Sequence, residues 1–429
     1  MTGRDNDART RPADEDYVEG DTVEITVGAP AHGGHCVARI GGEHGRVVFV
    51  RHALPGERVT AEITELHKGY LRADAIVIHE PSPDRVEPPC PYAHAHGCGG
   101  CDLQHVADEA QLAWKTAVVR EQLARMAGLT QAKIDTLGVR VERLPGGTLG
   151  WRSRVRYTVD AAGRPGLLKH RSHEVVAIDR CRIAHPAIQE LDVTGLRWPD
   201  DAAIEVVAST GGDVSVLTRP AADQLAPNDD PGDRAARISG PAELREIAAG
   251  REWHVPPEGF WQVHPAAADT LVDAVLDLLR PAPGETSWDL YGGAGLFAAA
   301  LAGHTGARTT VVESAPVGVA AARRNLAHLA GVEVVAAKVD VALARRRITG
   351  PVDLVVLDPP RTGAGARVVR GIAAAAPRAV AYVACDPAAL ARDIATFRGA
   401  GWELDRLRTY DCFPMTQHVE CVALLHPGR

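Results

Sequence analysis

The sequence predicts an α/β protein, in which a doubly wound, Rossmann-like parallel sheet follows a small β-barrel and a central α+β domain. Three patterns support this prediction. Short alternating strands separated by Gly and Pro occupy residues 20–80, as in small barrels of the oligonucleotide-binding type. Residues 139–220 alternate as antiparallel strands do. From about residue 256, helical segments rich in Ala and Leu alternate with short apolar strands, which is typical of a doubly wound sheet.

The overall composition is that of a globular protein. The chain has 429 residues, of which 45% are hydrophobic and 24% charged, enough for two to four domains with buried cores. It contains no apolar run of about 18 residues, so the sequence predicts no membrane span. Residues 1–19 hold six acids and no apolar core, which predicts a disordered tail rather than a secretory signal. We therefore expect a cytoplasmic protein, and no obligate protein partner is evident.

The charges are unevenly distributed along the chain. There are 47 Lys and Arg against 55 Asp and Glu, and the resulting net charge of −8 by itself argues against a nucleic-acid partner. Residues 140–182, however, hold ten Lys or Arg and four acids, whereas residues 200–250 hold four Arg and ten acids. The first stretch suits a polyanion, and an ordinary solvated surface is an equally good interpretation from charge alone.

Strands of the barrel and of the doubly wound domain can be placed individually. In the barrel, Val23–Val27 and Arg58–Ile63 alternate and Val47–Val50 is apolar. Five prolines in residues 81–91 indicate a linker into a central domain at 81–255, whose first helix is predicted at about residues 108–127. Residues 256–429 form the doubly wound domain. Its predicted strands are Ser287–Leu290, Thr309–Val312, Val332–Ala336, Leu354–Leu357 and Ala379–Val383.

A glycine-rich turn follows the first strand of the doubly wound domain. Residues 289–296 read Asp-Leu-Tyr-Gly-Gly-Ala-Gly-Leu, and glycines at such a turn let the backbone approach a ligand. Glu313 ends the next strand, where a carboxylate accepts hydrogen bonds from a ribose diol. A nicotinamide cofactor and S-adenosylmethionine both suit this pair. The glycine spacing departs from Gly-x-Gly-x-x-Gly, which favours S-adenosylmethionine.

The fourth and fifth strands also end in residues that carry chemistry. Asp358-Pro359-Pro360-Arg361 follows the fourth strand, at the edge where open sheets bind ligands, although a Pro-Pro pair also simply terminates strands. Arg361 can form bidentate bonds with an acceptor. Cys385 follows the fifth strand. It is either a small buried apolar residue or a nucleophile that faces the same crevice as Asp358.

The last motif is Phe413-Pro414-Met415-Thr416-Gln417-His418-Val419-Glu420. His418 and Glu420 flank Val419 on a predicted late strand, so both side chains are expected on one side of it. Alone, this pattern is typical of an exposed strand. Beside a nucleophilic Cys, Glu420 becomes a candidate general base.

Four of the eight cysteines form a candidate metal site. Cys98 and Cys101 are two residues apart, Cys90 lies close by, and Cys181 is the expected distant fourth ligand. Zinc and an iron–sulfur cluster both accept four thiolates. Two histidines within the loop after Cys90 also suit zinc.

The barrel and the motifs resemble two known families. Residues 20–80 resemble a TRAM domain, an RNA-binding module, in Gly20-Asp21, Gly33-Gly34 and Ala53-Leu54-Pro55-Gly56-Glu57. The four motifs, in this order and preceded by Phe260-Trp261-Gln262-Val263-His264, resemble the RNA uracil-5-methyltransferases, the 23S rRNA and tRNA 5-methyluridine enzymes. The sequence departs from that pattern at Gly292, where members commonly carry Cys, and at His264, where Asn is common.

The resemblance implies a role for each candidate residue. Cys385 would be the nucleophile, Glu420 the general base, and Arg361 a residue that positions the uracil. Four cysteines, Cys90, Cys98, Cys101 and Cys181, would hold a 4Fe-4S cluster rather than zinc. An amino-terminal TRAM-like barrel favours rRNA over tRNA as the partner. The residues implied in binding S-adenosylmethionine are Gln262, Tyr291, Gly293, Glu313, Asp340 and Asp358.

Uracil methylation explains why a Cys and a carboxylate are needed together. Carbon 5 of uracil becomes nucleophilic after a thiolate adds to carbon 6, and a base must then remove the carbon-5 proton. The cytosine-5 RNA enzymes are the nearest alternative, but they carry a Cys directly after the proline of the fourth-strand motif, where this chain has none. A non-catalytic RNA-binding iron–sulfur protein is the alternative from a different class.

Overall fold

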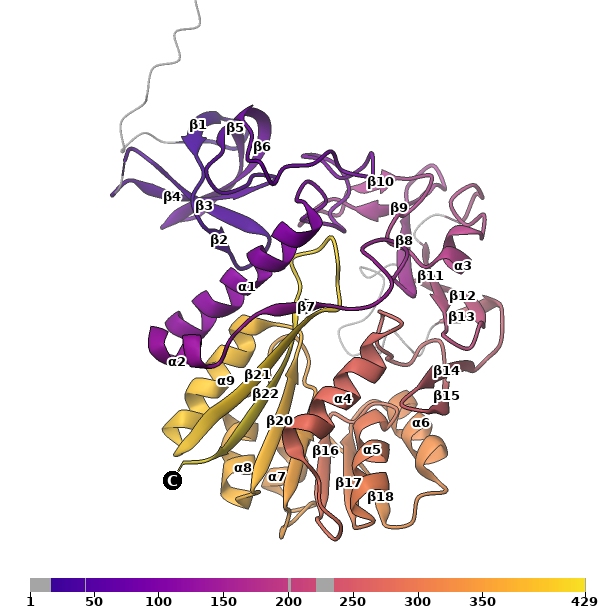
Figure 1. The fold of residues 1–429 in the computed structure, drawn as a ribbon. Coiled ribbons are helices and arrows are strands. Elements are labelled where there is room, and N and C mark those ends of the chain that lie inside the picture. Colours follow the sequence, from indigo (N-terminus) through magenta and orange to yellow (C-terminus); the bar gives the residue numbers. More distant parts are fainter. Residues whose placement is uncertain (1–16, 43, 200–201, 221–234, 429) are drawn as a thin grey trace, which may run out of the picture.

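The computed structural model describes residues 17–42, 44–199, 202–220 and 235–428 (Figure 1). Most of the predicted acidic tail, residues 1–16, lies outside these ranges. Figure 1 shows the barrel and the central domain side by side above the large doubly wound sheet. None of the helices in the described ranges combines the length and the apolarity that crossing a membrane requires.

The predicted barrel is present as a six-stranded sheet. Its strands are β1 (Thr22–Thr26), β2 (Pro30–Ala31), β3 (His35–Ile40), β4 (Arg46–Arg51), β5 (Arg58–Leu66) and β6 (Tyr70–Glu80). They are hydrogen-bonded in the order β1-β5-β6-β4-β3-β2. Alternate residues of β5, such as Val59, Ala61 and Ile63, are buried, as a half-buried strand requires. Trp114 and Val118, from the helix that follows, join this core.

The central domain is an antiparallel sheet with a separate hairpin. Its strands are β8 (Arg154–Val159), β9 (Pro165–Leu168), β10 (Val175–Ala177), β11 (Ala202–Ala208), β12 (Val214–Pro220) and β13 (Ala236–Ser239). They are ordered β10-β9-β8-β11-β12-β13, and a short helix, α3 (Pro186–Gln189), follows β10 in the chain. The hairpin consists of β14 (Leu244–Ala248) and β15 (Arg251–Val255) and leads directly into the doubly wound domain.

The doubly wound domain has the predicted parallel sheet at its centre. Its strands are β16 (Ser287–Leu290), β17 (Thr309–Glu313), β18 (Val332–Ala336), β19 (Leu354–Leu357), β20 (Ala379–Ala384), β21 (Trp402–Asp411) and β22 (Glu420–Pro427). The order is β18-β17-β16-β19-β20-β22-β21, with the first five parallel and β22 antiparallel to β20. From β16 the chain adds β17 and β18 on one side of the sheet, and it then adds β19 and β20 on the other side. Open sheets bind ligands at the point between two such halves.

Helices cover both faces of this sheet (Figure 1). One face is buried by α4 (Ala267–Leu279), α5 (Leu296–Thr305) and α6 (Pro316–Leu326). The other is buried by α7 (Val339–Ala344), α8 (Gly365–Ala375) and α9 (Pro387–Gly399), joined by α1 (Asp108–Arg125) and α2 (Gln131–Thr136). These two apolar layers hold the carboxyl ends of the parallel strands in fixed positions.

The sheet also recruits a strand from the preceding region. β7 (Val141–Arg143) pairs in parallel with β21, although the sequence places it within the predicted central domain at 81–255. Arg408 on β21 donates to Glu142 of β7 at 3.1 and 3.2 Å. The doubly wound sheet therefore includes a segment that lies more than a hundred residues before β16 in the chain.

Candidate active site

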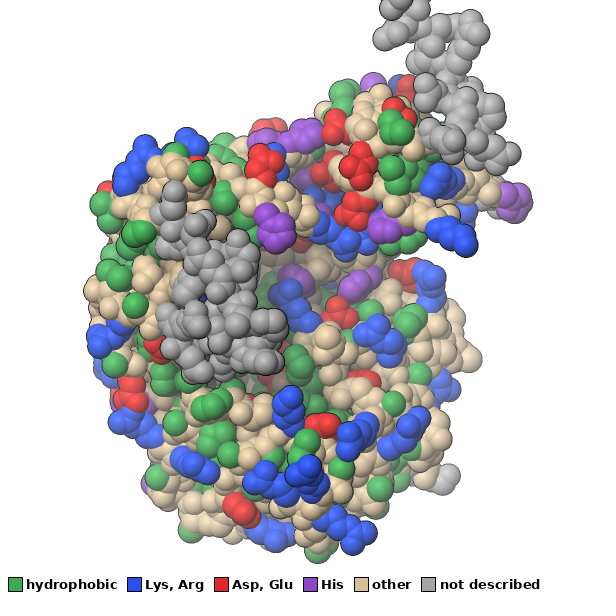
Figure 2. Space-filling view, turned by 180° about the vertical axis from the view of Figure 1, so that it is seen from behind, with side chains coloured by type: hydrophobic (Ala, Val, Ile, Leu, Met, Phe, Trp, Pro, Cys, Tyr) green, Lys and Arg blue, Asp and Glu red, His purple; other side chains and the backbone are tan. Residues whose placement is uncertain are grey.

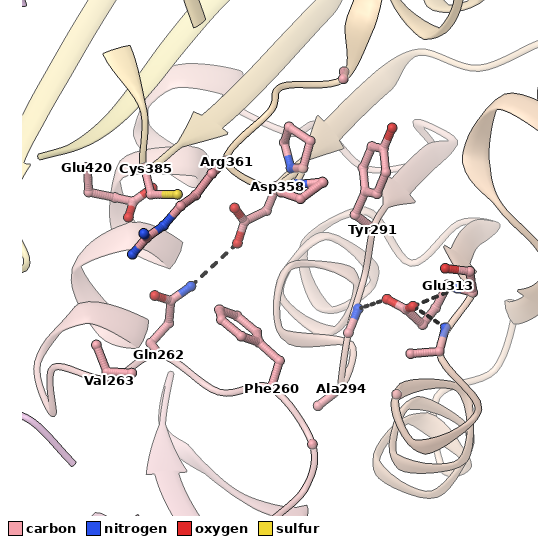
Figure 3. Close-up of a pocket in the computed structure, with 18 of the residues that line it drawn as sticks. Phe260, Gln262, Val263, Tyr291, Ala294, Glu313, Asp358, Arg361, Cys385 and Glu420 are labelled. Carbon is pink, nitrogen blue, oxygen red and sulfur yellow. Dashed lines mark hydrogen bonds between the residues drawn. The ribbon is translucent and has the colours of Figure 1, made fainter. Parts of the chain in front are cut away.

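A cavity of about 1360 Å³ opens at the carboxyl edge of the parallel strands. Figure 2 shows a hollow between the upper half of the molecule and the doubly wound domain below it. Every residue that the sequence predicts for catalysis or for donor binding lines this cavity: Gln262, Tyr291, Gly293, Glu313, Asp340, Asp358, Arg361, Cys385 and Glu420. In Figure 3, Cys385, Glu420 and Arg361 lie on one side of Asp358, with Tyr291 and Glu313 on the other.

The turn after β16 has an unusual backbone. Tyr291 has a φ of 62° and Gly295 a φ of 93°, both in the left-handed region that favours glycine. A Cβ on Gly295 would lie 2.6 Å from a methyl group of Leu326, so only glycine fits at the start of α5. Within the turn, the buried Asp289 accepts a hydrogen bond from the backbone N–H of Ala298 at 2.8 Å. Burial raises the pKa of Asp289 to about 8.

Glu313 ties the glycine turn to the end of β17. One carboxylate oxygen accepts from the N–H of Gly293 at 3.0 Å, and the other from the N–H groups of Ser314 and Ala315 at 2.6 Å. This fixes the carboxylate at the cavity wall, and the oxygen that accepts only from Gly293 keeps a lone pair for a further donor. A ribose diol is a ligand that such a carboxylate binds.

Asp358 occupies the middle of the cavity wall. It accepts a weak hydrogen bond of 3.4 Å from the side-chain amide of Gln262, as Figure 3 shows. Burial raises the pKa of Asp358 to about 7. A buried carboxylate with a single weak partner is prepared to bind a cation, because a positive group would supply the interaction that water no longer provides.

Cys385 and Glu420 lie in the same cavity. Cys385 is partly exposed at the end of β20, and Glu420 begins β22, the neighbouring strand. Burial and, to a smaller extent, the carboxylates of Glu420 and Asp358 raise the pKa of the Cys385 thiol to about 12, while Arg361 lowers it. Burial raises the pKa of Glu420 well above its ordinary value, and its Oε1 atom has no hydrogen-bond partner.

His418 does not share a strand with Glu420, contrary to the sequence prediction. Residues 412–419 form a loop, in which Met415 has a φ of 66°. Lys115 of α1 holds the base of this loop by donating to the carboxylate of Asp411 at 2.5 Å and to the carbonyl oxygen of Phe413 at 3.0 Å. His418 still lines the cavity, and burial lowers its pKa to about 3.

Comparison with known proteins identifies the family. Residues 18–76 match the model of the TRAM domain, and residues 249–427 match that of tRNA (uracil-5-)-methyltransferase. A protein of Streptomyces avermitilis, described as an uncharacterized RNA methyltransferase, is 46% identical over 95% of this chain and 99% of its own length. The chain belongs to the S-adenosylmethionine-dependent RNA uracil-5-methyltransferase family.

More distant relatives cover a similar extent of the chain. An uncharacterized RNA methyltransferase of Corynebacterium efficiens is 36% identical over 95% of this chain and 96% of its own length. The tRNA (uracil-54, C5)-methyltransferase of Pyrococcus abyssi, solved in complex with S-adenosyl-L-homocysteine, is similar in fold, with a TM-score of 0.68. It is 22% identical and covers 94% of this chain and 100% of its own. The predicted fold and family are thus confirmed.

The four predicted metal-ligating cysteines lie together in this methyltransferase. Cys90, Cys98, Cys101 and Cys181 are free thiols that line one small cavity. Among the described residues, however, no group of three or more His, Cys, Asp or Glu side chains is arranged to hold a metal ion. The cysteine cavity adjoins the larger one, because Arg152 lines both of them.

Two residues at the site were not assigned a role from the sequence. Phe260 is 65% exposed although it lines the cavity, which is unusual for a large aromatic side chain. His32, in the β2–β3 turn of the TRAM domain, lies 2.9 Å from the carboxylate of Asp386, the residue after Cys385. Asp386 also caps α9 by accepting from the N–H of Ala389 at 2.7 Å. No local pattern in the sequence marks His32, because its partner is 354 residues away.

Proposed function

We propose that this methyltransferase transfers a methyl group from S-adenosylmethionine to carbon 5 of a uridine in RNA through a covalent Cys385–uracil intermediate. The observation that carries the proposal is the presence of Cys385 and Glu420 in one cavity beside Asp358 and the glycine turn. A thiol, a base and a donor pocket that converge are what carbon-5 methylation requires. An amino-group methyltransferase has no need of the thiol.

The residues that would hold S-adenosylmethionine suit its charges. The donor supplies an electrophilic methyl group on a sulfonium, and it also carries an ammonium group and a ribose diol. Asp358, buried with only a weak hydrogen bond from Gln262, is suited to the cationic part. Glu313, fixed by three backbone N–H groups at the end of β17, is suited to the ribose diol.

Cys385, Arg361 and Glu420 would carry out the steps on the uracil ring. Burial raises the pKa of the Cys385 thiol to about 12, so the thiol gives up its proton, to water in the cavity, as it attacks the ring. The Cys385 thiolate adds to carbon 6 and the ring becomes an enolate, whose charge Arg361 is placed to stabilise. Carbon 5 then takes the methyl group as its bond to the sulfonium breaks, and S-adenosyl-L-homocysteine is left. Glu420 removes the carbon-5 proton, and the thiolate leaves as the double bond is restored.

Labelled methyl transfer to RNA tests the reaction. With S-adenosylmethionine labelled in its methyl group, the wild-type protein should yield labelled 5-methyluridine in RNA, and the Cys385→Ala variant none. Cys412→Ala is the matched control, because Cys412 is a buried thiol on the same domain that does not line the cavity. Full turnover by Cys385→Ala would refute the covalent mechanism. Labelled 5-methylcytidine instead of 5-methyluridine would refute the assignment of the base.

We favour rRNA over tRNA as the substrate. The support is the barrel at the amino-terminal end of the chain, which is the arrangement in the rRNA enzymes that the sequence resembles. The Pyrococcus abyssi neighbour, which aligns with 94% of this chain, is described as a tRNA enzyme, so tRNA is the alternative substrate. Mass mapping of nucleosides in rRNA and tRNA, from cells with and without this protein, decides between the two. Loss of 5-methyluridine from tRNA alone would contradict the preference.

We propose a 4Fe-4S cluster at Cys90, Cys98, Cys101 and Cys181. The donor set supports it, since four free thiols share one cavity. Zinc also accepts four thiolates, and metal analysis distinguishes the two. Anaerobically purified protein should be brown and contain about four irons per chain, whereas stoichiometric zinc without iron would refute the cluster.

A further inference from the structure

Half of the basic residues in the stretch that the sequence singles out are ion-paired in the structure. Residues 140–182 hold ten Lys or Arg, which the sequence suggests as phosphate contacts. Five of them form ion pairs with carboxylates between 2.6 and 3.5 Å away, so much of their charge is compensated within the protein. These five are Arg143, Arg154, Arg164, Lys169 and Arg171.

A second basic group lies on the catalytic domain, where the sequence shows a lower density of charge. We call it the α7–α8 basic patch. It consists of three residues that line the cavity, Lys338, Arg361 and Arg367, and three beyond its rim, Arg345, Arg346 and Arg370.

All six side chains of the patch are exposed. Arg345 and Arg346 follow α7, and Arg370 lies on α8, which packs against α7. Within the part of the chain that the structure describes, these three arginines form no ion pair and no side-chain hydrogen bond. Figure 2 shows Lys and Arg side chains gathered below the hollow, on the catalytic domain. The patch thus presents cations that no protein carboxylate compensates, apart from the pairing of Arg367 with Asp340 at 3.3 Å.

The carboxyl groups inside the cavity favour such cations at its mouth. Its wall carries the carboxyl groups of Glu313, Asp340, Asp358 and Glu420. A nucleotide that enters the cavity brings its own phosphates to the mouth, and these would be repelled by ionised carboxylates inside. Cations at the rim offset that repulsion and also release counterions from the RNA when they bind it. The ion-paired arginines of the central domain are less able to fill this role.

We propose that the α7–α8 basic patch binds the phosphate backbone of the RNA strand on one side of the target uridine. The proposal rests on the proposed function, because it takes the cavity to be the place where the uridine enters. RNA would then contact the catalytic domain itself, in addition to the TRAM barrel. The patch reads no base sequence, because phosphate contacts position a strand without specifying it.

Salt-dependent RNA binding tests this surface. The test variant is Arg345→Gln/Arg370→Gln, which removes two charges that make no described contact. The matched control is Arg280→Gln/Arg308→Gln, two exposed arginines at the opposite edge of the sheet, before β16 and β17. The probe is a fluorescein-labelled 20-nucleotide single-stranded RNA with one central uridine. Its affinity is measured by anisotropy between low and moderate salt.

Each lost phosphate contact should reduce the slope of log affinity against log salt by about 0.7, so the test variant should lose about 1.4 and the control nothing. Affinity for S-adenosyl-L-homocysteine should be equal in all three proteins, which shows that the fold is intact. A slope for the test variant equal to that of wild type would overturn the proposal, even if methyl transfer is normal. Absent methyl transfer in wild type, with the expected loss of slope, would instead refute the proposed function and leave the RNA surface standing.

Discussion

Replacing Glu420 by Gln should trap the protein on its RNA. The side chain is 3% exposed and its Oε1 atom has no hydrogen-bond partner, so an amide of the same shape should fit without lost contacts. Addition of Cys385 and methyl transfer do not need the carboxylate, and both should proceed. The amide cannot take the carbon-5 proton, however, so the thiolate cannot leave. The methylated uracil then stays attached to Cys385.

The size of the effect follows from the role of the base. General-base catalysis contributes about 100- to 10,000-fold, which corresponds to roughly 3–5 kcal/mol in the barrier to elimination. An enzyme that turns over about ten times per second would slow to between roughly 0.1 and 0.001 per second. Burial raises the pKa of Glu420 above its ordinary value, which makes its carboxylate a stronger base than an ordinary one and agrees with this role.

Denaturing electrophoresis and intact mass spectrometry detect the adduct. Glu420→Gln, incubated with RNA and S-adenosylmethionine, should give one stable RNA-bound species per chain that carries the added methyl group. The double variant Cys385→Ala/Glu420→Gln should give none. Glu403→Gln, an exposed glutamate on β21, should turn over like wild type. If Glu420→Gln instead turns over within tenfold of wild type and forms no adduct, Glu420 is not the base.

Three further predictions concern donor binding, the barrel contact and stability. Raising the pH from 6 to 8 should tighten S-adenosyl-L-homocysteine binding about tenfold. The pKa of Asp358 is raised to about 7, and only its ionised form attracts the ammonium group of the ligand. Calorimetry should show this pH dependence for the wild type and none for Asp358→Asn. His32→Ala removes the contact with Asp386 and should lower kcat about fivefold, the equivalent of about 1 kcal/mol. The affinity for S-adenosyl-L-homocysteine should be unchanged. An unaltered kcat would show that the contact does not position Cys385. Lys115→Met leaves Asp411 buried without its cation and should reduce the free energy of unfolding in denaturant by about 3–5 kcal/mol; a loss below about 1 kcal/mol would contradict this.

The elements that the sequence predicts well are those with a strong local pattern. The parallel strands around Asp289 and Asp358 are short apolar runs between Gly- and Pro-rich turns, and their observed bounds differ by at most one residue from the predicted ones. His418 and Glu420 are predicted on one late strand because they flank Val419. Residues 412–419 form a loop instead, since Lys115 and Gln111 of α1 hold Phe413 and Met415. These hydrogen bonds join residues that are distant in the sequence, so no local pattern predicts them.

In the candidate site, too, some residues can be predicted from the sequence and others cannot. Strand ends at one edge of a parallel sheet must meet, so the shared cavity of Asp358 and Cys385 follows from the fold class. His32 contacts Asp386, the residue after Cys385, from the TRAM domain, and this contact depends on packing that composition does not reveal. Three of the ten basic residues in 140–182, Arg143, Arg154 and Arg171, pair with carboxylates that are distant in sequence, which charge density along the chain does not reveal.

The pairing of β7 with β21 limits how this protein can be divided. The matched catalytic segment begins at residue 249, so a fragment cut there would lack β7 and the two helices before it. One edge of its sheet would lose its neighbouring strand, and the apolar side of α9 would lose Val119, Leu123 and Ile134. Unprotected strand edges invite association between molecules. We expect such a fragment to aggregate when it is expressed alone. A fragment that begins before α1 would keep β7 paired with β21 and the two helices packed against the sheet.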